Sequence, residues 1–478
     1  MDQLISAPHK VDRPARASTS LLEPALLKKF DINGPRYTSY PSADRFHQDF
    51  TEADYRLALK RISLSDQTLS LYIHLPFCPN ICYYCACNKI ITKDHGRSAK
   101  YIKYLAKEMA AVCEAMDLAP KQKLPLSQLH WGGGTPTFLS HAEMRELMGS
   151  IKNHFEFQQN GEYSIEIDPR RVTEADIKLL AELGFNRISL GVQDFNPEVQ
   201  QAVHRIQTLE ETQSVLNWSR KYGFTSSSVD LIYGLPKQTP TSFAKTVQAV
   251  IEMNPDRLSV YSYAHLPHIF KPQRRIAESD LPNAVDKLQI LSSTIDQLIA
   301  AGYTYIGMDH FARPSDELVV AQKEGRLQRN FQGYSTQAEC NMLAFGVTAI
   351  GKVDDCYVQS VRTLDEYYAL LDHHRLPTLR GMRLSADDVV RRDFIGQLMC
   401  HFEVDVSHFS QKYGIDFDAY FANEVSELNY LEDCGLIEWH GDTLIVPISG
   451  RLLVRRVAMV FDRHLRESLS QGSYSKIV

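Results

Sequence analysis

Residues 71–89 read LYIHLPFCPNICYYCACNK and hold four of the nine cysteines of the chain. The apolar start predicts a strand that runs directly into a loop, and such loops carry the active sites of parallel α/β enzymes. Within the loop, Cys78, Cys82 and Cys85 have the spacing C-x3-C-x2-C. This spacing lets three thiolates converge on one centre from a single turn of chain.

Three sulfurs are one fewer than a closed zinc or iron–sulfur site needs. The residues alone leave two main interpretations open, because both kinds of centre accept thiolates. One is an iron–sulfur cluster with one iron open to an outside ligand. The other is a structural zinc ion completed by Cys87 or His74. Four unconnected free cysteines within ten residues are improbable.

Beyond this loop, short apolar runs alternate with helical patterns up to about residue 310, which predicts βα units and a parallel sheet. The predicted strands are residues 69–75, 127–131, 163–167, 187–192, 227–233, 258–263 and 303–308. Gly184, Gly223 and Gly302 each stand between a predicted helix and the next strand, about one or two 40-residue modules apart. This period favours an α/β fold with a partial or full (β/α) barrel. A doubly wound open sheet fits the same pattern.

The chain divides into three parts by composition. Residues 1–50 are rich in Pro and Ser and predict an N-terminal arm, and residues 51–365 predict the barrel domain. Residues 366–478 predict a mostly α-helical C-terminal domain with one hairpin, whose turn is His440-Gly441-Asp442. A long amphipathic helix is expected from about Gly450 to Leu469.

Composition excludes several classes of protein. The 478 residues carry a net charge of −6, so nothing suggests nucleic-acid binding, and an anionic substrate would need a local group of Arg and Lys. No apolar run reaches the length of a membrane span, and the N-terminus lacks the apolar core of a secretory signal. An odd number of cysteines without such a signal does not suggest a disulfide framework. We therefore expect a cytoplasmic protein that does not enter membranes.

The cysteine loop resembles the signature of the radical S-adenosylmethionine (radical SAM) superfamily, including an aromatic residue, Tyr84, just before the last cysteine. The resemblance implies a barrel of the radical SAM type. It also implies that Cys78, Cys82 and Cys85 hold a [4Fe–4S] cluster, whose fourth iron is chelated by S-adenosylmethionine.

Four segments narrow the resemblance to the oxygen-independent coproporphyrinogen III oxidase family, with a match from about residue 30 to the C-terminus. The segments are residues 72–78 (YIHLPFC), 85–89 (CACNK), 35–41 (PRYTSYP) and 307–312 (GMDHFA). The resemblance implies oxidative decarboxylation of two propionates of coproporphyrinogen III to vinyl groups, giving protoporphyrinogen IX in haem biosynthesis. It further implies two S-adenosylmethionine molecules, an unidentified one-electron donor protein, a monomeric enzyme and a catalytic role for Cys87.

An alternative is a haem-binding or haem-trafficking relative without oxidase activity. Such relatives typically lack a cysteine at the position of Cys87 and the segment at residues 35–41. Both are present in this chain, which favours the oxidase.

The resemblance also implies which residues surround S-adenosylmethionine. They are Tyr72, Tyr84, Gly133, Gly134, Thr135, Glu166, Gln193, Arg205, Asp230, Ala264 and Ile350. Independently of the family, Glu166 and Asp230 are lone acids in apolar runs, and a buried acid needs a partner. Several basic residues are candidates for binding the propionates: Arg36, Lys271, Arg274, Arg275, Arg313 and Arg329.

Overall fold

The structure is a computed structural model that describes residues 20–21, 23–64, 67–118, 122–337, 340–467, 474 and 476. Its centre is a sheet of 12 strands in the order β16-β15-β14-β13-β1-β4-β5-β6-β7-β8-β10-β9. The parallel part consists of β13 (Asn341–Phe345), β1 (Leu69–Leu75), β4 (Leu124–Gly133), β5 (Phe155–Ile167), β6 (Arg187–Gln193), β7 (Ser226–Tyr233) and β8 (Arg257–Ser262).

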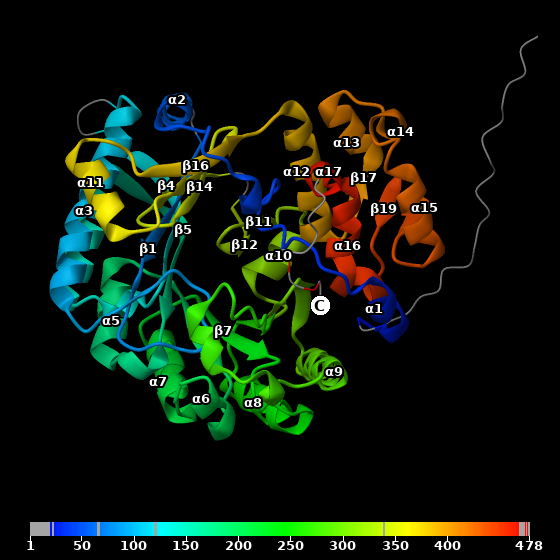
Figure 1. Ribbon diagram of the computed structural model, residues 1–478, viewed down its shortest axis with the longest axis horizontal. Coiled ribbons are helices and arrows are strands. Elements are labelled where there is room, and N and C mark those ends of the chain that lie inside the picture. The colour runs from blue at the N-terminus through cyan, green and yellow to red at the C-terminus, as the bar shows by residue number, and fades with distance from the viewer. Residues whose placement is uncertain are drawn as a thin grey trace, which may run out of the picture.

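In the series β1, β4, β5, β6, β7 and β8, each new strand is added on the same side of the one before, with helices in between. These helices are α3 (His95–Ala115), α4 (His141–His154), α5 (Glu174–Leu183), α6 (Pro197–Ala202), α7 (Leu209–Lys221) and α8 (Pro240–Met253). Within this series the strand order does not reverse as it does in a doubly wound sheet. Figure 1 shows α3, α5, α7 and α8 along the outside of the curved sheet. The predicted α/β fold with a partial barrel is therefore confirmed.

The glycines between helices and strands have the predicted role. Gly184, Gly223 and Gly302 have φ angles of 106°, 81° and 84°, a region that side chains disfavour. Each reverses the chain after a helix so that the next strand can enter the sheet.

The last predicted strand is part of a hairpin that the sequence did not predict. After α9 (Ala284–Ala300), β9 (Thr304–Gly307) turns through Met308 and Asp309 into β10 (His310–Ala312). Strand β10 inserts between β8 and β9 and is antiparallel to both. The turn leaves no room for a crossover helix, so the chain can only fold back on itself.

The other edge of the sheet was also missed by the sequence analysis. There β13 lies beside β1 and is followed by the antiparallel strands β14 (Ile350–Val353), β15 (Cys356–Ser360) and β16 (Thr378–Arg383). Between β10 and β13 the chain forms α10 (Glu317–Lys323) and a hairpin of β11 (Gln328–Asn330) and β12 (Gly333–Ser335).

The boundary expected between residues 365 and 366 falls inside α11 (Leu364–Asp372), and β16 beyond it still belongs to the large sheet. We therefore propose that the C-terminal domain begins at α12 (Ala386–His401). It continues with β17 (Glu403–Asp405), α13 (Val406–Tyr413), α14 (Phe417–Tyr420), α15 (Val425–Asp433), β18 (Glu438–His440), β19 (Thr443–Ile445), α16 (Val454–Ala458) and α17 (Arg463–Glu467). The predicted hairpin is β18–β19, and β17 adds a third strand to it.

The long helix expected from Gly450 to Leu469 is wrong. The chain breaks at Asp462, which has φ −84° and ψ 95°. The Asp462 carboxylate accepts hydrogen bonds from the backbone N–H of Leu465 and from the hydroxyl of Tyr37. It thus starts α17 and ties this domain to the arm; the end of the predicted helix, after Glu467, lies outside the described residues.

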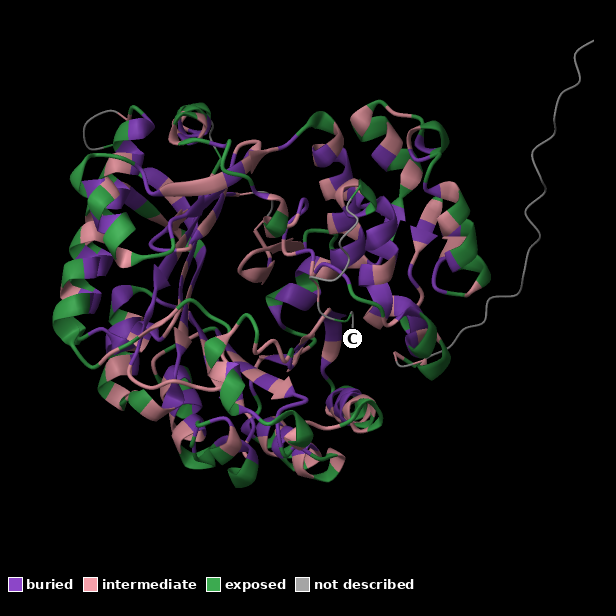
Figure 2. Cartoon of the chain, viewed as in Figure 1, coloured by how far each residue is buried: buried purple, intermediate pink, exposed green. Residues whose placement is uncertain are grey.

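The described part of the arm is packed against both domains. It forms α1 (Pro24–Phe30), and α2 (Glu52–Ile62) follows it. The buried guanidinium of Arg455 donates to the carbonyl of Pro35 over 2.7 Å, and His47 pairs with Gly381 of β16. Figure 2 shows α16, which carries Arg455, as largely buried.

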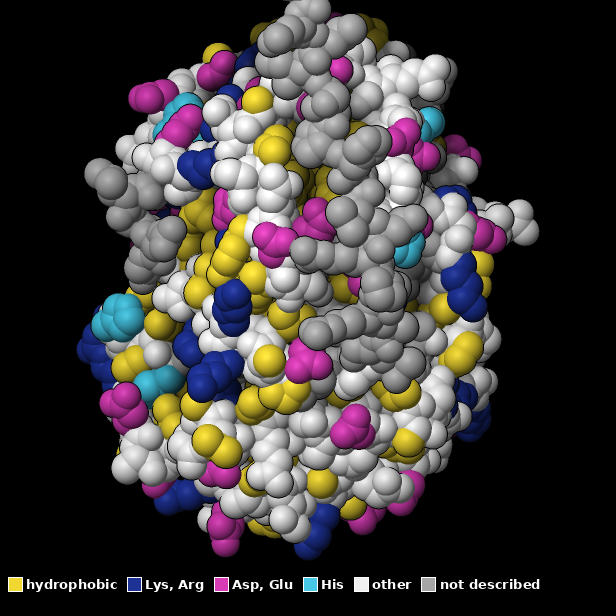
Figure 3. All heavy atoms as spheres, turned by 90° about the vertical axis from the view of Figure 1, so that its right-hand side faces the viewer, with side chains coloured by type: hydrophobic (Ala, Val, Ile, Leu, Met, Phe, Trp, Pro, Cys, Tyr) yellow, Lys and Arg dark blue, Asp and Glu magenta, His cyan; other side chains and the backbone are white. Residues whose placement is uncertain are grey.

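Charged side chains of both signs lie on the face of the molecule that Figure 3 shows. On the face in Figure 3, Lys and Arg side chains are interspersed with Asp and Glu and form no basic stripe. Among the described residues, no helix is long and apolar enough to cross a membrane.

Candidate active site

The cysteine loop leaves the C-terminal end of β1 and is closed at its base. Strand β2 (Phe77–Cys78) pairs in parallel with β3 (Ile90–Ile91), on the far side of the loop. The backbone N–H of Ile90 donates to Pro76 over 2.7 Å, and that of Thr92 donates to Cys78 over 3.0 Å. Residues 79–89 are therefore held as a compact loop over the end of the sheet.

A glycine triplet at the end of β4 packs directly against this loop. The backbone N–H of Gly134 donates to Leu75 over 2.8 Å, and that of Thr135 donates to Phe77 over 2.9 Å. A Cβ atom at Gly133, where φ is 109°, would lie 2.6 Å from the ring of His74. Only glycine lets the two segments approach this closely.

A cavity of about 330 Å³ opens beside the loop, at the C-terminal ends of β4 to β7. Twelve of the predicted site residues line it: Cys78, Cys82, Tyr84, Cys85, Cys87, Gly133, Gly134, Thr135, Glu166, Gln193, Arg205 and Asp230. The carboxyl ends of neighbouring parallel strands meet at one edge of a sheet, so the fold itself gathers them.

The other three predicted residues lie outside the lining of this cavity. The hydroxyl of Tyr72 contacts Nδ1 of His74 at 3.0 Å. The carbonyl of Ala264 accepts a hydrogen bond from Gln273, whose amide also donates to the carbonyl of Tyr84. Ile350 packs in a separate apolar cluster with Phe46 and Tyr357. Their binding roles stay predictions.

The donor set fits a cluster better than a zinc ion. Both ring nitrogens of His74 are already engaged, by the Tyr72 hydroxyl at 3.0 Å and the Asn88 carbonyl at 3.1 Å. Within the described residues, no three His, Cys, Asp or Glu side chains converge tightly enough for a single metal ion. Cys78, Cys82 and Cys85 instead line one cavity, which offers space for a cluster beside them.

Polar groups around the cysteines favour negative charge on sulfur. Two guanidinium groups face Cys82 Sγ, that of Arg170 at 3.9 Å and that of Arg205 at 3.8 Å. The hydroxyl of Thr135 lies 3.5 Å from Cys78 Sγ. A hydrogen bond from Cys87 lowers the pKa of Cys85 to about 6, with help from Lys89. Thiolates are the form that binds metal.

Burial acts in the opposite direction on the most enclosed of these thiols, because it raises the pKa of Cys78 to about 11. A nearby metal centre would have to supply the positive charge that keeps this sulfur ionised.

Two carboxylates and two unsatisfied polar atoms face the cavity. Glu166 accepts hydrogen bonds from the backbone N–H of Gly133 at 3.1 Å and from His130 at 3.3 Å, and these outweigh its burial and lower its pKa. Burial raises the pKa of Asp230 to about 6. In the described part of the chain, Gln193 Oε1 and Arg205 Nε are buried without a hydrogen-bond partner. A polar ligand such as S-adenosylmethionine would satisfy such atoms.

Arg170 and His130 are site residues that the sequence analysis missed. Arg170 forms an ion pair with Asp168 at 2.6 Å and reaches Cys82 from the turn after β5. The motif Asp168-Pro169-Arg170, directly after a strand, is a signal that could have found it. His130 faces the inside of the barrel and contacts Glu166 because alternate residues of β4 point inward.

The candidate cations for the propionates are scattered. Arg36 pairs with Asp309, and Arg313 donates to the carbonyl of Ala301 over 2.8 Å, away from the cysteines. Lys271, Arg274 and Arg275 are exposed on one short 3-10 helix. Arg329, in β11, packs against Tyr334, with its guanidinium carbon 4.8 Å from the ring centre.

Comparisons with known proteins agree with this geometry. Residues 72–250 match the model of the radical SAM superfamily, and residues 384–453 match that of the HemN C-terminal domain. The oxygen-independent coproporphyrinogen III oxidase of Pseudomonas aeruginosa is 49% identical over 95% of this chain and 98% of its own length. That of Escherichia coli K12 is 46% identical over 95% of this chain and 98% of its own length.

A solved structure of coproporphyrinogen III oxidase (HemN) from Escherichia coli, described as a radical SAM enzyme, aligns with a TM-score of 0.87 at 45% identity. The alignment covers 93% of this chain and 99% of that one. Sequence, cysteine geometry and fold therefore lead to one conclusion: this chain belongs to the oxygen-independent coproporphyrinogen III oxidase family of radical SAM enzymes.

Proposed function

We propose that this chain converts two propionates of coproporphyrinogen III to vinyl groups without oxygen, giving protoporphyrinogen IX. The observation that carries the proposal is the cavity in which three cysteines and nine other predicted site residues meet at the ends of the barrel strands. Relatives that match nearly the whole chain bear the name of this activity. The trafficking alternative has no observation in its favour.

The chain uses a [4Fe–4S] cluster and S-adenosylmethionine, as its superfamily implies. Together these supply, when bound, a radical able to remove a hydrogen atom from an unactivated carbon. Cys78, Cys82 and Cys85 would hold the cluster. That two S-adenosylmethionine molecules are used is part of the proposal.

The chain's own residues would bind and orient S-adenosylmethionine. Backbone at Gly133 and Gly134 presents no side chain to the ligand, so a ligand can approach the main chain closely. The ionised carboxylate of Glu166 is fixed by Gly133 N–H and can accept hydrogen bonds from an amino or hydroxyl group. Gln193 and Arg205 offer the buried unsatisfied atoms described above.

Cys87 would act on the substrate side of the loop. It is an exposed thiol next to the cluster cysteines, and its carbonyl accepts a hydrogen bond from Lys89 over 3.3 Å. A thiol in this place can donate a hydrogen atom or a proton to a bound substrate. We further propose a cytoplasmic monomer that receives single electrons from a separate donor protein.

The test is turnover under strict exclusion of oxygen. The full chain, reconstituted with iron and sulfide, is mixed with coproporphyrinogen III, S-adenosylmethionine, a reductant and a one-electron acceptor. We expect the two-vinyl product, with none formed by a Cys82→Ser variant. Haem binding without any vinyl product in the wild-type reaction would refute the oxidase and support the trafficking alternative.

A further inference from the structure

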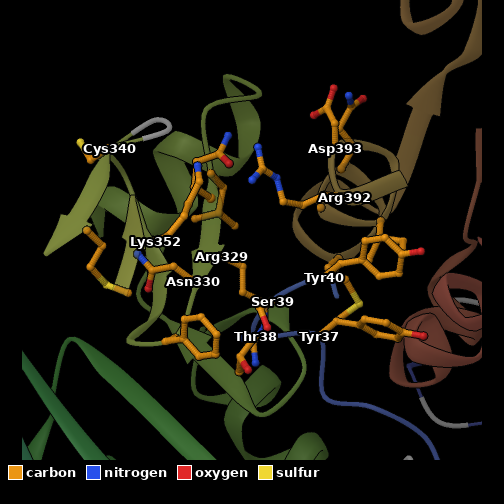
Figure 4. A pocket seen from close by; sticks show the side chains of 18 of the residues that line it. Tyr37, Thr38, Ser39, Tyr40, Arg329, Asn330, Cys340, Lys352, Arg392 and Asp393 are labelled. Atoms are coloured by element: carbon orange, nitrogen blue, oxygen red, sulfur yellow. The ribbon is translucent and has the colours of Figure 1, made fainter. Parts of the chain in front are cut away.

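A second cavity lies away from the cysteines, where the arm, the barrel and the C-terminal domain meet (Figure 4). Its volume is about 120 Å³. Residues 37–40 of the arm form one side, the β11 segment and the start of β13 form another, and α12 forms the third. All three parts must be folded together for this cavity to exist.

Its wall is strongly cationic. Arg329 from β11, Lys352 from β14 and Arg392 from α12 all line it. Among the described lining residues, Asp393 is the one acid. Its carboxylate accepts hydrogen bonds from Lys412, at 2.8 Å, and from the hydroxyl of Tyr413, at 2.9 Å. Figure 4 shows the Asp393 side chain pointing away from the centre of the cavity, so it does not neutralise these cations.

The two guanidinium groups are not fully satisfied within the described part of the chain. Nε and Nη1 of Arg329, and Nη1 of Arg392, are buried without a hydrogen-bond partner. The ring of Tyr334 gives Arg329 a cation–π contact at 4.8 Å, which offers attraction but accepts no ordinary hydrogen bond. Burying such groups is costly unless an anion is bound.

The positive charge of Arg329 affects the pKa of the neighbouring His310. Burial, followed by repulsion from Arg329, lowers the pKa of His310 to about 3. The nearby imidazole therefore stays neutral and adds no further positive charge.

We propose that this cavity binds a carboxylate group of the substrate, with Arg329 and Arg392 as its two ligands. The inference rests on the proposed function, because coproporphyrinogen III carries four propionates and only two of them react. A planar guanidinium can bind a carboxylate through two parallel hydrogen bonds. Two such groups on different domains would therefore select a substrate that carries an anionic side chain at this position.

This cavity shares two lining residues with a third cavity, which lies inside the barrel. Gln128 and Asn330 also line a cavity of about 180 Å³ inside the barrel. That interior cavity shares Glu166 and Asp230 with the cysteine cavity. One ligand with carboxylates at several corners can thus be anchored by the arginines while another corner faces the reacting centre. Arg329 and Arg392 are binding residues in this scheme and do not touch the reacting atoms.

The test measures binding of coproporphyrin III, the stable oxidised form of the substrate, to the reconstituted full chain by fluorescence. Arg329→Gln and Arg392→Gln should each raise Kd about 10- to 100-fold, the range for loss of a charge-assisted hydrogen bond. Lysine at either position keeps the charge but loses the two-point contact, so the Kd of a lysine variant should lie between those of the wild type and the glutamine variant. Lys323→Gln removes an exposed charge from the end of α10 and should leave Kd unchanged.

Kinetics give a second readout. In both glutamine variants KM for coproporphyrinogen III should rise with Kd, and kcat should change much less, because the contact is the same before and during the reaction. Unchanged Kd and KM in folded glutamine variants, with an active wild-type enzyme, would overturn the carboxylate site. An inactive wild-type enzyme would instead count against the proposed function. If the glutamine variants fail to fold, the lysine variants decide between these outcomes.

Discussion

Replacing Gly133 by alanine tests whether close packing of the glycine triplet holds the cysteine loop. The new Cβ would lie 2.6 Å from both Cε1 and Nδ1 of the His74 ring. That ring cannot easily turn away, since its two nitrogens contact Tyr72 and Asn88. The clash must therefore be relieved by moving β4 and the loop apart.

The magnitude follows from two separate costs. A φ of 109° strains any residue other than glycine, by about 1–3 kcal/mol. Overpacking against His74 adds about 1–3 kcal/mol. Gly184 is a matched control, because its φ is 106° and an added Cβ there meets nothing within 4 Å. Gly184→Ala should therefore show the backbone cost alone.

The assay compares the free energy of unfolding in urea of the two alanine variants and measures the iron they retain after anaerobic reconstitution. We expect Gly133→Ala to be less stable than Gly184→Ala by about 1–3 kcal/mol and to lose iron. Gly184→Ala should keep its iron. If both variants lose the same stability and both keep full iron, the packing argument for the triplet is refuted.

Three other predictions concern the cysteines and a buried acid. Cys78→Ser should lose most of the iron, measured by chemical analysis and absorbance, because it removes one of three cluster ligands; full iron content would contradict the ligand assignment. Cys87→Ser should keep its iron and lose product formation, and loss of iron would instead make Cys87 a ligand. Burial raises the pKa of Glu108 from 4.5 to about 7, so the folded chain holds this proton more tightly and its free energy of unfolding falls as pH rises through this interval. In urea unfolding, the wild-type free energy of unfolding should decline by about 3 kcal/mol between about pH 5 and about pH 8, and Glu108→Gln should remove this decline. The same pH dependence in both proteins would count against the prediction.

Local sequence was sufficient for the features that depend on neighbours in the chain. Apolar runs predicted β1 and the strands from β4 to β8, and Gly184 and Gly223 marked the ends of helices, since both signals arise from backbone conformation and period. The spacing of Cys78, Cys82 and Cys85 predicted one metal centre, because short loops fix where their side chains can reach. The ends of parallel strands meet at one edge, so Glu166 and Asp230 could also be placed near that centre.

The tertiary structure alone decided what depends on contacts between distant segments. No local pattern indicates that β10 inserts between β8 and β9, or that β13 pairs with β1 across more than 250 residues. The break at Asp462 arises because its carboxylate binds Tyr37 of the arm, which the pattern of a helix cannot reveal. Arg329 and Arg392 also face one cavity because distant segments pack together. Whether a charged side chain is buried and paired depends on that packing, and its position in the sequence does not reveal it.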